Sequence, residues 1–204
     1  MNTALLDRGQ VIERIRAANP DLAGAVDHPE AEMTRVPESF LPAGWALARI
    51  TRFFPTRSLI LHVLVGPGGA GGLVTGDPGA FNRIVATAGV KVADEVMALE
   101  IARTFIEATK VQSRRYQCIQ VPGELPWRPG LDDEETGRME AVLQRVRACL
   151  TPRVDAGTDG GYVVHLAVVS DMDLVQADLS VASGGTVSVT HRTLEEDLPF
   201  TYVV

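Results

Sequence analysis

The sequence predicts one α+β domain over residues 1–204, in which an antiparallel sheet with a C-terminal three-stranded meander curves against about four helices. Three observations lead there. Residues 162–170, 174–182 and 186–194 are β-rich runs joined by very short loops, as in a meander. Residues 95–110 carry a wide apolar stripe at helical spacing. Helical and strand patterns do not alternate strictly, which argues against a doubly wound parallel sheet.

Short loops set the register of the meander. Because side chains alternate between faces, apolar residues of paired strands should share one face. In the second hairpin, a three-residue loop at 183–185 places Val181 opposite Val187, with a glycine in the left-handed position. A two-residue loop at Gly184-Gly185 would mix polar and apolar residues on each face.

The first hairpin decides where two histidines lie. A three-residue loop at 171–173 places His165 opposite Leu179, on the same apolar face as His191. A two-residue loop at 172–173 would send His165 to the other face. On the shared face, the two imidazoles predict acid–base catalytic residues in a cavity between sheet and helices. The alternative is two partly buried histidines that are hydrogen-bonded to backbone or helix groups.

Four helices are expected, and polar residues at their starts support them. Asp7, Asp77 and Asp94 are suitable N-caps, and a run of acidic residues favours the positive end of the last helix dipole. These helices cover residues 7–18, 77–88, 95–110 and 132–150. Further strands are expected at residues 45–53, 58–65, 73–75 and 116–121.

Two segments lack such patterns. Residues 21–42 hold three prolines and little periodicity, so we expect a long surface loop or an arm that touches another subunit. Residues 199–204 form an apolar tail that would add an edge strand or close a dimer.

Composition excludes several classes of function. A net charge of -7 and a pI near 5.1 argue against nucleic acid and against an anionic membrane as partners. No run reaches the roughly 18 apolar residues of a membrane helix, and the N-terminus does not resemble a signal peptide. Cys118 and Cys149 lack a metal or disulfide spacing, so reduced thiols in a cytoplasm are expected. The preference for arginine over lysine is typical of a GC-rich bacterial genome.

The motifs predict no cofactor and no metal. Residues 66–71 match the glycine pattern of a dinucleotide loop, but an extended segment follows where a helix would have to start. Residues 171–173 have two aspartates, yet they lack the further ligands of a calcium loop. The four histidines are too scattered for a zinc signature, and no serine lies in a nucleophile elbow.

Four other residues are candidates for ligand binding. Arg114 and Arg115 form a pair that can clamp a carboxylate or a phosphate, although compensation of a helix dipole also explains them. Glu124 and Trp127 lie in a proline-rich loop that would form the rim of a pocket.

Together these observations favour a non-enzymatic, cytoplasmic binding or protein-interaction domain that forms a homo-oligomer or binds a protein partner. The alternative is a cofactor-independent enzyme of the isomerase or cyclase type, in which His165 and His191 line a cavity that accepts a small organic molecule.

Overall fold

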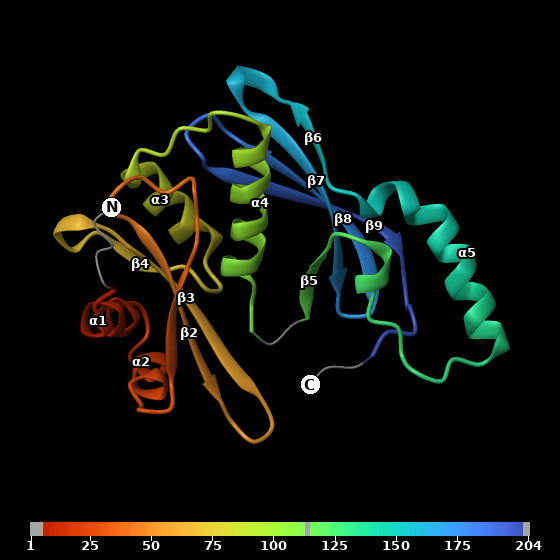
Figure 1. The fold of residues 1–204 in the computed structure, drawn as a ribbon, viewed down its shortest axis with the longest axis horizontal. Coiled ribbons are helices and arrows are strands. Elements are labelled where there is room, and N and C mark those ends of the chain that lie inside the picture. The colour runs from red at the N-terminus through yellow and green to blue at the C-terminus, as the bar shows by residue number, and fades with distance from the viewer. Residues whose placement is uncertain (1–5, 113–114, 202–204) are drawn as a thin grey trace.

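A computed structural model describes residues 6–112 and 115–201. It confirms the predicted single-domain α+β fold with antiparallel strands, although the strands form two sheets where the sequence analysis expected one. One sheet has four strands and the other has five. Helix α4 (Glu95–Thr109) lies between the two sheets (Figure 1).

The N-terminal sheet, called sheet A, has its strands in chain order and antiparallel. One face is covered by two short helices, and the apolar cluster between them includes Ile15, Ile50 and Leu61. The elements of this unit are α1 (Arg8–Ala18), α2 (Pro20–Val26), β1 (Glu32–Val36), β2 (Ala46–Phe53), β3 (Ser58–Val65) and β4 (Gly71–Leu73).

The prediction of a long loop or arm at residues 21–42 is wrong, because much of this segment forms helix α2 and strand β1. Asn19 accepts hydrogen bonds from the backbone N–H groups of Asp21 and Leu22, and Pro20 occupies the first turn. An Asn-Pro pair therefore starts a second helix here as well as ending the first. Strand β1 is short and mostly exposed, and its pairing with β2 holds it in place.

The C-terminal sheet, called sheet B, has the order β5-β7-β8-β9, and β6 also pairs with β7. Strand β6 was not expected from the glycine- and aspartate-rich sequence around it. The strands are β5 (Tyr116–Ile119), β6 (Arg153–Ala156), β7 (Tyr162–Ser170), β8 (Asp173–Val181) and β9 (Val187–Glu195).

The second meander hairpin has the predicted register, with Val181 paired to Val187. The loop is residues 183–185, and Gly185 takes a left-handed φ of 79°. A Cβ atom at Gly185 would come within 2.8 Å of Val90, so both the backbone and the space require glycine there.

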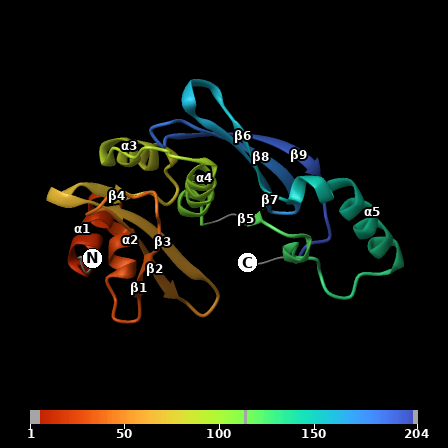
Figure 2. The ribbon, with the colours of Figure 1, turned by 45° about the horizontal axis from the view of Figure 1, so that its top comes forward.

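Three further helices complete the fold: α3 (Pro78–Ala88), α4 (Glu95–Thr109) and α5 (Asp133–Leu150). The predicted caps Asp77 and Asp94 are confirmed, since each accepts a backbone N–H at the helix start, and Asp132 caps α5 in the same way. Helix α4 packs between the sheets (Figure 2). One apolar cluster continues from Leu64 through α4 to Leu166. Short 3-10 turns occur at Pro67–Gly69, Pro122–Glu124 and Thr158–Gly160.

Helix α5 covers only one half of the outer face of sheet B, the face that is turned away from α4. Val142 and Val146 of α5 pack there against Ala167 and Val169 of β7. The other half of this face has mostly polar and exposed side chains. Sheet B therefore has one covered face and one face that is half open to solvent.

The C-terminal tail pairs inside its own chain. Phe200 forms an antiparallel bridge with Trp127, and Arg128 N–H donates to the carbonyl of Pro199 at 2.8 Å. The expected outer edge strand is therefore not formed by residues 199–201, because the proline-rich loop already takes their backbone groups. Residues 202–204 lie outside the described part.

Among the described residues, no helix combines the length and the apolar character that crossing a membrane requires.

Candidate functional site

The first meander hairpin differs from both turns considered for it. Ser170 pairs with Asp173, so the turn consists of Asp171 and Met172, and Asp171 adopts a left-handed φ of 56°. This register places His165 opposite Asp178. The predicted position of His165 on the apolar face is wrong, because β7 is apolar on both sides and its sequence pattern does not distinguish the two faces.

The two histidines therefore lie on opposite faces of sheet B. His191 pairs with Ala177 on the face that packs against α4, as expected. His165 belongs to the outer face with Asp178. The two imidazoles cannot line one cavity, so the predicted two-histidine catalytic site does not form.

His165 is part of a network that joins three strands. Its Nδ1 lies 2.6 Å from Asp178 Oδ1, and its Nε2 lies 3.1 Å from Asp155 Oδ2. Only a protonated ring can donate to both carboxylates at once. Gln176 also donates to Asp178 at 2.6 Å. Both ring nitrogens are occupied, so this geometry ties β6, β7 and β8 together and leaves no nitrogen for a substrate.

The pKa of Asp178 reflects the same network. Burial acts to raise it, but hydrogen bonds from Gln176 and His165 and the nearby charge of Arg192 outweigh burial, so the pKa of Asp178 lies below its usual value. The carboxylate therefore stays ionised and fits a role as an anchor.

His191 is exposed, and its one side-chain partner in the described structure is Tyr116. The Tyr116 hydroxyl bonds to His191 Nε2, and the two rings meet edge-on at 5.9 Å. Burial, with a smaller contribution from Cys118, raises the pKa of Tyr116 to about 12. The phenol is therefore neutral near pH 7 and acts as a hydrogen-bonding partner across the sheet.

Of the two arginines in the predicted clamp, only Arg115 can be described, because Arg114 lies outside the described residues. The Arg115 side chain donates to the carbonyl of Thr201, and its backbone N–H donates to Asp171 at 3.3 Å. Burial lowers the pKa of Arg115 from its usual value. Arg115 thus connects the C-terminal tail to the β7–β8 turn.

The predicted pocket rim also has contacts within the chain. Glu124 accepts the backbone N–H of Gln120 at 2.7 Å, which closes the turn after β5. The ring of Trp127 lies 4.9 Å from that of Phe200 and packs on the α5 cluster. The lining of the two cavities described below includes neither residue.

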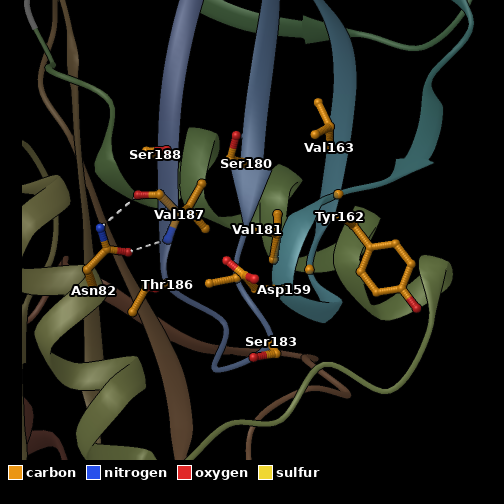
Figure 3. Close-up of a pocket in the computed structure, with 13 residues that line it drawn as sticks. Asn82, Asp159, Tyr162, Val163, Ser180, Val181, Ser183, Thr186, Val187 and Ser188 are labelled. Atoms are coloured by element: carbon orange, nitrogen blue, oxygen red, sulfur yellow. Dashed lines mark hydrogen bonds between the residues drawn. The ribbon is translucent and has the colours of Figure 1, made fainter.

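A groove of about 440 Å³ lies at the start of β7, the end of β8 and the start of β9 (Figure 3). Asn82 of α3 stands at its edge. The Asn82 amide donates to the carbonyl of Val187 at 2.8 Å and accepts the Val187 N–H at 2.8 Å. Asn82 thus takes the place that a neighbouring strand would have beside Val187. Nothing local in the sequence of α3 indicates this role.

Beyond Asn82, the outer edge of β9 has no partner in the described structure. Val187 turns its backbone groups away from β8, and alternate residues of a strand do the same. The edge groups are therefore those of Val189, His191 and Thr193, and no backbone bond joins them to the described part of the chain. No acidic residue lies between Val187 and Leu194.

The edge of sheet A at β1 is different. It is five residues long, it contains Glu32 and Arg35, and prolines lie on both sides of it. Short length, charge and proline are the usual means of keeping an edge strand unpaired. Strand β9 has nine residues and lacks proline, so its edge is the better candidate for an interface.

Within residues 6–112 and 115–201, no group of three or more His, Cys, Asp or Glu side chains is arranged to hold a metal ion. The glycine motif at 66–71 leads into strand β4, and α3 begins only at Pro78, so it lacks the helix of a dinucleotide loop.

A scan of protein-family models, a search of curated proteins and a search of solved structures each found no match for this chain.

Proposed function

We propose that this protein is a non-enzymatic interaction domain that self-associates through the edge of β9. The observation that carries the proposal is the row of edge groups at Val189, His191 and Thr193, which follows the position that Asn82 closes. An unpaired edge of this kind is a template for another strand. The free thiols of Cys118 and Cys149 support a reducing, cytoplasmic setting.

A second copy fits this edge because an antiparallel strand can pair with itself about a two-fold axis. A register centred on His191 pairs Val189 with the partner's Thr193 and uses all three edge residues. A register centred on Thr190 would need Val187, whose groups Asn82 already holds. A register centred on Arg192 would oppose two guanidinium groups, which costs free energy. We therefore place the two-fold axis at His191.

Proline at the centre of the edge tests the proposal. His191→Pro removes the central N–H without breaking a backbone bond of the described chain, and proline is tolerated on strand edges. We expect wild-type protein to have the mass of a dimer by light scattering, and His191→Pro to have the mass of a monomer with unchanged circular dichroism.

The matched control is His191→Val, which also loses the Tyr116 hydrogen bond but keeps the backbone N–H. It should remain a dimer. Monomeric wild-type protein at all accessible concentrations would refute the proposal, and so would a His191→Pro protein that stays dimeric.

A further inference from the structure

A second cavity, of about 690 Å³, lies at the opposite end of the molecule from α5, between the start of α1, the start of β2 and the glycine-rich loop after β3. Its volume is in the range of small-molecule sites. Arg14 of α1 and Arg35 of β1 both contribute to its lining. This site is separate from the edge of β9 and does not depend on the proposed self-association.

Two guanidinium groups in this lining have no ion-pair partner among the described residues. Neither Arg14 nor Arg35 bonds to a carboxylate within the described chain, whereas Arg16 of the same helix pairs with Glu13 and Asp27. The Nε of Arg14 is buried and has no hydrogen-bond partner there. A buried donor without a partner is costly, and an anion would satisfy it.

The loop beside these arginines is narrow and built of glycine. Gly68 and Gly69 have left-handed φ angles of 61° and 85°. A Cβ atom at Gly69 would lie 3.6 Å from Arg14 Nη2, so the guanidinium lies close to the loop backbone. The 3-10 turn Pro67–Gly69 therefore lies next to the Arg14 side chain.

The charge of the lining limits the ligand. Asp7 also lines the cavity, where it accepts the backbone N–H of Gln10 at 3.2 Å. Two arginines and one aspartate leave a net charge of +1. A singly charged anion balances this lining, whereas a dianion such as phosphate would leave an excess negative charge beside Asp7.

The rest of the wall is apolar. Trp45 packs flat on the loop, since a Cβ atom at Gly66 would lie 2.7 Å from its ring. Leu6, Val65 and Pro67 also contribute to the lining. We infer that the cavity binds a small organic monocarboxylate, with its carboxylate on Arg14 and Arg35 and its apolar body near Trp45.

Calorimetric titration of the full chain with benzoate, benzamide and inorganic phosphate tests the inference. We expect saturable binding of benzoate, with benzamide and phosphate each about tenfold weaker or worse, because the first lacks the charge and the second carries too much. In a Trp127→Phe background the remaining tryptophan is Trp45, and benzoate should change its fluorescence.

Three glutamine variants locate the site. Arg14→Gln and Arg35→Gln should each weaken benzoate binding about tenfold, while Arg16→Gln, two residues along the same helix, should leave it unchanged. Arg35 is exposed, so its variant keeps the test valid if Arg14→Gln fails to fold. No saturable benzoate binding, equal binding of benzamide, tighter binding of phosphate, or wild-type affinity in Arg35→Gln would overturn the inference.

Discussion

Helix α4 packs against two sheets that face it with different chemistry. Sheet B presents mainly aliphatic side chains to the helix, including Leu166 and Leu179, with Tyr116 and Cys118 of β5 beside them. Sheet A presents Leu47 and Leu64 to the same cluster, but His62 lies beside Leu64 on that face. The comparison shows that one helix can be held by a mainly apolar contact on one side and, on the other, by a contact that includes a buried histidine.

Two ionisable groups, His62 and Glu38, lie on the side of α4 that faces sheet A. Their pKa values are shifted in opposite directions from the ordinary values. His62 is 3% exposed, and its Nδ1 has no partner in the described chain. Burial, helped by the charges of Arg49 and Lys110 and opposed by the charge of Glu107, lowers the pKa of His62 to about 4. Burial also favours a neutral Glu38, which accepts a hydrogen bond from Thr104 at 2.9 Å.

The largest effect should come from the mainly apolar contact with sheet B. Leu179→Ala removes a fully buried side chain of β8 and should lower the free energy of unfolding by about 2–5 kcal/mol. Denaturant titration measures the change, which should be similar at pH 5 and pH 7 because no charge is involved. Ser180→Ala, on the exposed face of the same strand, should change stability by less than about 0.5 kcal/mol. Similar losses in both variants would contradict this assignment of the core.

A smaller, pH-dependent effect is expected at His62. Its folded pKa of about 4 lies below the ordinary 6.5, so the unfolded chain takes up the proton first as the pH falls. Stability from this group is complete above pH 6.5 and is lost towards pH 4, by about 3 kcal/mol. His62→Leu should therefore gain stability relative to wild type as the pH falls through this window. Denaturant titrations from pH 4 to 7 would contradict this if the difference stayed constant.

The smallest effect, with the opposite sign, is expected at Glu38. Burial raises its pKa to about 7, with Glu100 also raising it and the Thr104 hydrogen bond lowering it. The unfolded chain loses this proton near pH 4.5, so wild-type stability falls as the pH rises from 4.5 to 7. Glu38→Gln should gain about 1 kcal/mol over wild type across that window, after allowance for partial exposure. The same denaturant titrations measure this difference. An advantage of Glu38→Gln over wild type that grew as the pH fell would contradict the prediction.

Local chemistry explains which parts of the fold could be predicted. Asp7, Asp77 and Asp94 cap helices because the cap and its N–H partners are three residues apart or less in the chain. The hairpin at 183–185 follows from clear alternation on both of its strands and from glycine at the position that requires a left-handed backbone. In these cases the deciding contacts lie within a few residues.

Other parts could not be predicted because their partners are distant in the chain. Strand β1 has little apolar pattern and exists because β2 supplies its hydrogen bonds. Asn82 binds the edge of β9 from 105 residues away. The side of the sheet on which His165 lies depends on a two-residue turn whose Asp171 accepts a left-handed backbone, an option that aspartate tolerates but does not demand.

The amino-acid order alone therefore accounts for the α+β class, most of the helices and strands, their caps, and one hairpin register. Tertiary contacts account for the division into two sheets around α4, the separation of His165 from His191, the edge of β9, and the placement of Arg14 and Arg35 around one cavity. The physical reason is the range of the interactions. Propensity, capping and turn geometry act over a few residues, whereas strand pairing and burial join segments that only the folded chain brings together.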